Sequence, residues 1–120
     1  MNAQGIGTDI VAVQRIAALI DRYGDRFLKR VFTQSEQDYC AAKSNPAEHF
    51  AGRFAAKEAI AKAIYQSGHN SVIPLHEIEV INDPEGRPHV HLKRFHHLVC
   101  LVSISHERDH AIAMAMLQEG

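Results

Sequence analysis

The sequence predicts a single α+β domain, with helices in the first half of the chain and antiparallel strands in the second. The chain has 120 residues, the size of one domain, and no repeat, low-complexity tract or linker divides the span 1–120. Apolar residues recur at helical spacing before residue 67, whereas β-branched residues gather in short runs after residue 77. A set of helices followed by a set of strands is typical of the α+β class.

The chain is expected to open with a short strand over 4–11, whose two glycines would let another backbone or a ligand approach closely. An amphipathic helix should follow over 13–23, because apolar residues recur there at i, i+3, i+4 and i+7. Gly24 predicts a stop or a kink before a second helical piece over 25–31.

Two further helix starts are visible. Residues 33–36 read T-Q-S-E, the form of a capping box, and predict a third helix. Asn45 followed by Pro46 predicts the N-cap and first position of a longer helix, which is rich in alanine and should run to about Gln66. The Ser67-Gly68 pair should end it.

The second half predicts four strands. A strand over 78–81 and a return strand over 90–92 flank a type I turn at 83–86, which together make a hairpin. The run 98–105, rich in Val, Ile and Leu, is expected to be a central strand, and 111–117 should form the last one.

The composition excludes several classes of protein. Thirteen Lys and Arg against 14 Asp and Glu give a formal charge of −1, which excludes nucleic-acid binding through a polybasic arm as the main function. No apolar run approaches the ~20 residues of a membrane span, and residues 1–5 lack the features of a signal peptide. Cys40 and Cys100 are then expected to be reduced, buried thiols in a cytoplasmic protein that binds neither nucleic acid nor membrane.

Asp9 is the first candidate for chemistry. It follows two glycines at the end of the predicted strand among apolar residues, where a carboxylate is costly unless it is paired or metal-bound. Aspartate is also a favoured helix N-cap, so Asp9 has an alternative interpretation as the cap of the helix over 13–23.

Glu58 and Lys62 lie four residues apart on one face of the long helix. Such a pair is most often a surface ion pair worth ~0.2–0.5 kcal/mol. Phe50 and Phe54 precede it at the same spacing, and solvated pairs seldom share a face with aromatic rings, which weakens that interpretation.

His106 follows a predicted buried strand and enters a polar turn, a suitable place for a functional side chain on a rigid support. The alternative is a strand-end histidine that is satisfied by backbone groups. The histidines of 89–97 have no cysteine or carboxylate at zinc-site spacing, so a solvated strand face is favoured for them.

Arg15, Arg22 and Arg26 would fall within roughly 20° of one direction if a single helix continued through Gly24. These arginines form either a solvated face or a docking surface for an acidic partner.

Several motifs occur together along the chain. Residues 5–11 read G-I-G-T-D-I-V, and 50–59 read F-A-G-R-F-A-A-K-E-A with Lys62 in the expected place after them. Residues 86–88 read G-R-P and 103–106 read S-I-S-H. In this order they resemble the G-I-G-x-D-I, F-A-x-R-F-A-A-K-E-A, G-x-P and S-I-S-H motifs of one family, the small holo-[acyl-carrier-protein] synthases, which are 4′-phosphopantetheinyl transferases. One segment departs from the pattern: where the family usually has a Gly-Thr-Gly turn, 64–69 read I-Y-Q-S-G-H.

The resemblance implies the 4′-phosphopantetheinyl transferase fold and a reaction of fatty acid biosynthesis. A serine hydroxyl of an acyl carrier protein attacks the β-phosphate of coenzyme A, phosphopantetheine moves to the serine, and adenosine 3′,5′-bisphosphate leaves. Asp9 and Glu58 would hold Mg²⁺, or Mn²⁺ in its place, and would be catalytic together with Lys62. The group that takes the serine proton stays open. The coenzyme A-binding positions that the resemblance implies are Arg53, Lys62, Pro88 and His106.

The resemblance also implies partners. Acyl carrier proteins are acidic and helical, so Arg15, Arg22 and Arg26 would dock the carrier, with Phe27 in an apolar spot. A homotrimer with active sites between subunits is implied as well. Two alternatives remain: the same chemistry on a polyketide or peptide synthase carrier, and a non-catalytic α+β interaction module.

Overall fold

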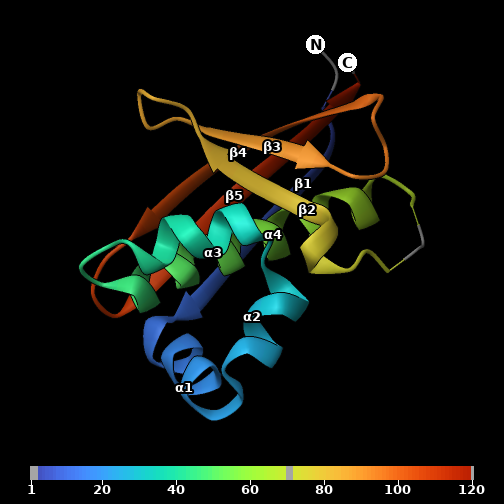
Figure 1. Cartoon of the computed structure of the whole chain (residues 1–120). Coiled ribbons are helices and arrows are strands. Elements are labelled where there is room, and N and C mark those ends of the chain that lie inside the picture. The colour runs from blue at the N-terminus through green and yellow to red at the C-terminus, as the bar shows by residue number, and fades with distance from the viewer. Residues whose placement is uncertain (1–2, 70–71, 120) are drawn as a thin grey trace.

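The computed structural model describes residues 3–69 and 72–119 and confirms the α+β class (Figure 1). The order of elements along the chain is β1 (Ala3–Ala12), α1 (Val13–Tyr23), α2 (Asp25–Val31), α3 (Gln34–Ala41), α4 (Pro46–Gln66), the short 3₁₀ helix η1 (Leu75–Glu77), β2 (Ile78–Asn82), β3 (Pro88–Leu92), β4 (Leu98–His106) and β5 (His110–Glu119). Every predicted helix and strand is present, and η1 is the element that the sequence did not predict.

The strands form two antiparallel sheets. One has the order β1-β5-β4, and the other is the β2-β3 hairpin. The last strand, β5, is therefore the central one, and the prediction that 98–105 would be central is wrong. The sequence of β4 has apolar residues on both faces, the pattern expected of a central strand, although β4 lies at the edge of the sheet. Ala113 of β5 pairs with Asp9 on one side and with Ile104 on the other.

The long helix α4 packs across one face of the three-stranded sheet (Figure 1). At Gly5 an added Cβ would lie 2.1 Å from the carbonyl oxygen of Ala63, and at Gly7 it would lie 1.9 Å from that of Ala59. Distances this short exclude any side chain at either glycine. The glycines of the strand and the alanines of the helix thus bring β1 against α4, backbone to backbone.

The opposite face of the same sheet is apolar and exposed. Six large side chains on β1, β5 and β4 have exposed fractions from 40% to 64%: Ile6, Ile10, Ile112, Met114, Val99 and Leu101. Contiguous apolar surface of this kind is typical of a face that binds another molecule.

Gly24 separates α1 from α2 because its φ of 54° lies in the left-handed region. Thr33 forms the predicted capping box with Glu36. Asn45 occupies the N-cap of α4, but its side chain makes no capping hydrogen bond to the described residues.

Both cysteines are free thiols; Cys40 is buried as predicted, and Cys100 is only partly buried. Burial raises the pKa of Cys40 to about 12 and that of Cys100 to about 11, so neither is a reactive thiolate at neutral pH. Within 3–69 and 72–119, no helix has the length and apolar character needed to cross a membrane.

Candidate active site

Asp9 projects from β1 toward α4, where Lys62 meets it. The Lys62 Nζ donates hydrogen bonds to Asp9 Oδ1 at 3.2 Å and to the Thr8 carbonyl at 2.9 Å. The N-cap of α1 is Ala12, so the alternative interpretation of Asp9 as a helix cap is wrong. Asp9 is instead a mostly buried carboxylate, with 16% of its side chain exposed, and its cationic partner is on the long helix.

Glu58 lies one turn before Lys62 on α4 and is half-buried. Burial raises the pKa of Glu58, and the negative charge of Asp9 raises it further, while Lys62 and Arg15 oppose the rise. Lys62 is thus bonded to Asp9 rather than to Glu58, and the surface ion pair that the i, i+4 spacing predicts is replaced by a contact between helix and strand. Two carboxylates and two cations converge at this point.

The donor set at this point fits a hard divalent cation. Two carboxylates that destabilise each other's ionised form are stabilised by a shared cation. A Mg²⁺ site takes one or two carboxylates and fills its other positions with waters and phosphate oxygens. Within the described part of the chain there is no cluster of three or more His, Cys, Asp or Glu side chains that could hold a metal by themselves. Asp9 and Glu58 match the sparse donor set of Mg²⁺ and not the closed set of a structural zinc.

A cleft of about 540 Å³ adjoins Glu58. Its walls are mainly apolar, and they include Ala61, Tyr65, Ile73 and Leu75. Tyr65 belongs to the segment that departs from the family's Gly-Thr-Gly pattern, and its side chain is 68% exposed. The departure therefore places an aromatic ring beside the candidate metal site.

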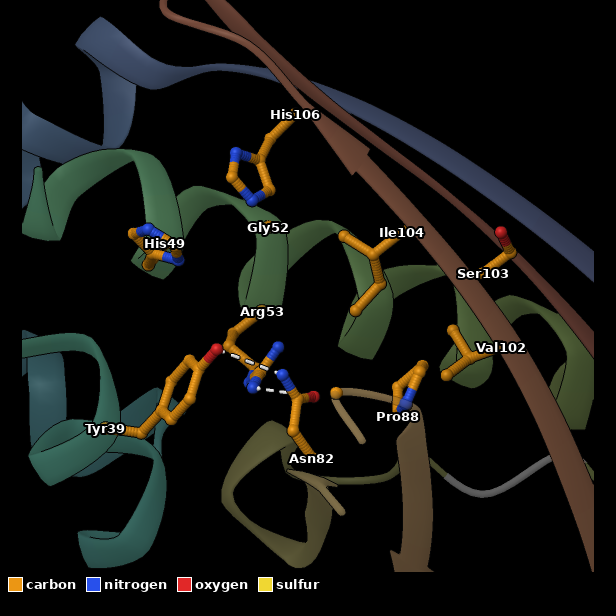
Figure 2. Close-up of a pocket in the computed structure, with 11 residues that line it drawn as sticks. Tyr39, His49, Gly52, Arg53, Asn82, Pro88, Val102, Ser103, Ile104 and His106 are labelled. Atoms are coloured by element: carbon orange, nitrogen blue, oxygen red, sulfur yellow. Dashed lines mark hydrogen bonds between the residues drawn. The ribbon is translucent and has the colours of Figure 1, made fainter. Parts of the chain in front are cut away.

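A second cavity, of about 280 Å³, lies between α3, α4, the β2-β3 hairpin and β4 (Figure 2). Three of the predicted coenzyme A positions, Arg53, Pro88 and His106, line it together. The fourth, Lys62, lies with Asp9 instead. Residues that are up to 53 positions apart in the sequence are thus gathered in one cavity.

Arg53 is the cationic centre of the second cavity (Figure 2). Its Nη2 donates to Asn82 Oδ1 at 3.1 Å, and its guanidinium lies 4.6 Å from the ring centre of Tyr39. Asn82 Nδ2 donates in turn to the Tyr39 hydroxyl at 3.0 Å. The Arg53 Nε is buried and lacks a hydrogen-bond partner among the described residues. Arg53 nevertheless places a fixed positive charge in the wall of the cavity, which suits an anion.

His106 forms the far wall of this cavity (Figure 2). Its Nδ1 lies 2.6 Å from Glu48 Oε1, and its ring centre lies 4.9 Å from that of His49. A carboxylate therefore orients the His106 ring, and the alternative in which backbone groups satisfy it is wrong. Burial lowers the pKa of His49, and the neighbouring His106 lowers it further.

The residues of the second cavity and its immediate support that sequence reasoning missed include Tyr39, Glu48, His49 and Asn82. Helical spacing could have predicted His49, because it lies four residues before Arg53 on α4 and is therefore on the same face of the helix. Tyr39 and Asn82 come from α3 and β2, and their approach to α4 depends on tertiary packing that no local pattern shows.

The two cavities lie on different sides of the molecule. Asp9 is on β1 at one edge of the three-stranded sheet, and His106 is on β4 at the other. Arg53 and Glu58 are five residues apart on α4, which turns their side chains about 140° from each other. Within the described residues the two cavities have no lining residue in common. The chain thus carries two separate candidate sites.

The predicted surface of Arg15, Arg22 and Arg26 is divided in the structure. Because α1 ends at Gly24, the three arginines do not lie along one continuous helix. Arg22 and Arg26 still meet around Tyr23, with guanidinium carbons 5.2 Å and 6.0 Å from its ring centre. Phe27 lines an adjoining cleft of about 390 Å³ with Arg26. Arg15 lies apart from them, 5.6 Å from the Phe54 ring centre and close enough to Glu58 to oppose the rise in its pKa.

The histidine-rich strand β3 is solvated as predicted. His89 and His91 are exposed, and His89 Nε2 lies 3.0 Å from Asp83 Oδ2 beside the hairpin turn. This contact supports the turn.

Comparison with known proteins places the chain in a family. The family model of the 4′-phosphopantetheinyl transferase superfamily matches residues 5–115. The chain is 45% identical to a holo-[acyl-carrier-protein] synthase of Protochlamydia amoebophila, with 93% of this chain and 95% of that protein covered. It is 46% identical to the corresponding protein of Chlorobaculum parvum, with 94% and 97% covered.

A solved structure agrees with these relatives. The crystal structure of a holo-(acyl-carrier-protein) synthase from Bacillus anthracis in complex with CoA (3′,5′-ADP) is 32% identical. It superposes with a TM-score of 0.83 over 98% of each chain. The chain therefore belongs to the 4′-phosphopantetheinyl transferase superfamily and, within it, to the holo-[acyl-carrier-protein] synthases, which are enzymes.

Proposed function

We propose that this enzyme transfers 4′-phosphopantetheine from coenzyme A to a serine of the apo acyl carrier protein of fatty acid biosynthesis, in the cytoplasm and with a divalent cation. The serine hydroxyl gives up its proton, and its oxygen forms a bond to the β-phosphorus of coenzyme A. The bond from that phosphorus to the bridging oxygen of the pyrophosphate breaks. Adenosine 3′,5′-bisphosphate leaves with the electron pair of that bond. The observation that carries the proposal is the convergence of Asp9, Glu58 and Lys62 where β1 meets α4.

Asp9 and Glu58 are the residues that would hold Mg²⁺, and Mn²⁺ suits the same oxygen donors. When bound, the ion supplies positive charge to the pyrophosphate oxygens as negative charge moves to the leaving group. The raised pKa of Glu58 supports this assignment, because two neighbouring carboxylates gain from a cation between them.

Lys62 would contribute a second positive charge. Its side chain is 54% exposed, so the ammonium can contact a phosphate oxygen while it still touches Asp9. Phosphoryl transfer depends mainly on the placement of such charges around the phosphorus. Lys62 therefore serves both in coenzyme binding and in catalysis in this proposal.

The second cavity would take the nucleotide end of coenzyme A. The positive charge of the Arg53 guanidinium in the cavity wall suits a phosphate group, and His106 forms a further polar wall. Pro88 offers an apolar surface to the adenine. The structure of the Bacillus anthracis relative is a complex with CoA (3′,5′-ADP), which supports a nucleotide of this kind as the ligand.

A homotrimer would complete the site. The nucleotide cavity borders β4 and the acidic pair borders β1, at opposite edges of one sheet. Contact between unlike edges of neighbouring copies is heterologous, and such contacts form a ring when the rotation between copies closes. The exposed apolar face that includes Ile6, Leu101 and Met114 would be buried between the copies. The family resemblance implies three copies.

The carrier would dock on the surface formed by α1 and α2. Arg15, Arg22 and Arg26 offer positive charge to an acidic helix, and Phe27 lies in the adjoining cleft.

A transfer assay tests the proposal. The protein is incubated with coenzyme A, Mg²⁺ and an apo acyl carrier protein, and the carrier is weighed by mass spectrometry. The carrier should gain one phosphopantetheine, and a chelator should prevent the gain. Carriers from polyketide and peptide synthases, tested in parallel, show which carrier class is preferred. Unmodified carriers throughout, together with no metal-dependent coenzyme A binding, would instead indicate a non-catalytic interaction module.

A further inference from the structure

Lys57, the residue before Glu58, is fully buried although it carries an ammonium group. Its Nζ donates hydrogen bonds to the carbonyl oxygens of Val31 and Ile78, both at 2.7 Å, and of Leu75 at 3.0 Å. One side chain of α4 therefore holds the end of α2, the helix η1 and the start of β2. Burial lowers the pKa of Lys57, and a carboxylate beside it opposes that effect.

That carboxylate belongs to Glu36 on α3, which is also fully buried and forms an ion pair with Lys57 at 2.5 Å. Glu36 Oε1 accepts a hydrogen bond from the Thr33 amide at 2.9 Å, and Oε2 accepts one from the Val80 amide at 2.8 Å. Glu36 thus joins α3 to β2 as well as to α4. Both charges have several partners, which is the condition under which a buried ion pair is tolerated.

A second set of contacts joins the same three elements. Tyr39 of α3, Asn82 of β2 and Arg53 of α4 contact one another at the wall of the nucleotide cavity (Figure 2). Each member is close in sequence to a member of the buried set. Tyr39 follows the acid of the ion pair by three residues, Asn82 follows Val80 by two, and Arg53 precedes the lysine of the pair by four.

These intervals keep each residue on the same face of its element as its buried neighbour, because helices repeat at three to four residues and strands at two. The buried set and the cavity set are therefore parallel layers across α3, β2 and α4. A shift of one element would change both layers together.

We propose that the Glu36–Lys57 ion pair is a positioning element of the nucleotide cavity, which fixes the spacing of α3, β2 and α4 and so holds Tyr39 and Asn82 around the Arg53 guanidinium. This inference rests on the proposed function, since it assigns the cavity to the nucleotide of coenzyme A. A pair of apolar side chains would fill the same space, but it would leave the Val80 amide and the carbonyl groups without directed partners. Buried ionic groups are best known for fixing register of this kind.

The test compares Glu36→Gln with the wild type, using adenosine 3′,5′-bisphosphate as the probe and calorimetry to measure its Kd. We expect Kd to rise about tenfold, which corresponds to the loss of one well-placed interaction, while the KM for the carrier stays within about twofold. Ile64→Val is the control, because Ile64 is buried on α4 and has no polar role. It should lower Tm without changing Kd.

A double-mutant cycle separates positioning from mere stabilisation. If the ion pair acts through the cavity contacts, Glu36→Gln should add little to the rise in Kd that Asn82→Ala already causes. If the increases in the free energy of binding caused by Glu36→Gln and Asn82→Ala simply add in the double variant, the inference is overturned.

If Glu36→Gln does not fold, the combined variant Glu36→Leu/Lys57→Met provides a second test. Removing both charges together leaves no unpaired buried charge, so this variant should fold, with a lower Tm because the Val80 amide and the carbonyl groups lose their partners, and it should still bind the bisphosphate weakly. A folded variant with the wild-type Kd would refute the positioning role alone. A wild-type protein that does not bind the bisphosphate would refute the proposed nucleotide site itself.

Discussion

Lys62 of α4 donates a hydrogen bond from Nζ to Asp9 Oδ1 of β1, at 3.2 Å, and thereby joins residues 53 positions apart. The contact depends on how closely the strand and the helix approach. Gly7, two residues before Asp9, allows that approach because the carbonyl of Ala59 occupies the place of a side chain. The candidate site is thus a product of backbone packing as much as of charge.

Gly7→Ala should disrupt both stability and activity. The new Cβ would meet the Ala59 carbonyl at 1.9 Å, so β1 must move away from α4 and carry Asp9 with it. We expect a loss of at least about 2 kcal/mol in the free energy of unfolding, measured by urea denaturation. The transfer rate should fall by more than the decrease in the folded fraction of the protein explains. Ala41→Gly, at the exposed end of α3, is the control and should leave the rate unchanged. A wild-type rate in Gly7→Ala would contradict the close-packing account.

Glu58→Gln should stabilise the metal-free protein while it abolishes transfer. Because burial and Asp9 raise the Glu58 pKa above its ordinary value of 4.5, the ionised form is disfavoured in the folded state. This penalty is fully present above the raised pKa and absent below the ordinary one. In a chelating buffer, Tm of the variant should therefore exceed that of the wild type at pH 7, and the difference should vanish as the pH falls below about 4.

Added Mg²⁺ should raise Tm of the wild type and not that of Glu58→Gln, because a ligand that binds only the folded state stabilises it. Glu85→Gln removes an exposed carboxylate at the hairpin turn and serves as the control. It should behave like the wild type in both buffers. An equal response of Tm to Mg²⁺ in Glu58→Gln would exclude Glu58 as a ligand.

Arg22→Glu should raise the KM for the carrier at least about tenfold, because reversing a charge at a docking surface adds repulsion to the lost attraction. The KM for coenzyme A should stay nearly unchanged. Arg22 is a cleaner choice than Arg15, whose charge also acts on Glu58. Lys93→Glu, an exposed reversal after β3, is the matched control. Equal increases in both KM values for Arg22→Glu would refute the docking role.

Met114→Glu should separate the subunits. Met114 is 46% exposed on the apolar face of the sheet, where a carboxylate would have to be buried in a homotrimer. Sedimentation should show a folded monomer that lacks transfer activity, whereas Ser35→Glu, on the exposed side of α3, should remain a trimer. A wild-type protein that sediments as an active monomer at micromolar concentration would rule out sites shared between subunits.

The sequence predicts the parts of this molecule that depend on local pattern. The capping box at Thr33, the glycine at position 24 and the alanine-rich helix each carry a short-range signal, and the structure places their boundaries as expected. Strand order carries no such signal. The apolar run of β4 suggests a central strand, but sheet position depends on β5 pairing with both β1 and β4.

The candidate site likewise has residues that sequence motifs predict and residues that only tertiary packing brings together. Asp9, Glu58 and Lys62 belong to quoted motifs, and the structure brings them together. Tyr39 and Asn82 reach Arg53 through the packing of α3 and β2 against α4, where the buried ion pair lies, and a pairing across three elements is invisible to periodicity.

The central claim is that Asp9 and Glu58 share one divalent cation, and Mn²⁺ binding followed by electron paramagnetic resonance tests it most directly. With coenzyme A present, the wild type should bind one Mn²⁺ per subunit, Mg²⁺ should displace it, and Asp9→Asn and Glu58→Gln should each weaken binding at least about tenfold. If both variants bind Mn²⁺ as tightly as the wild type, the two carboxylates do not hold the metal and the account is wrong.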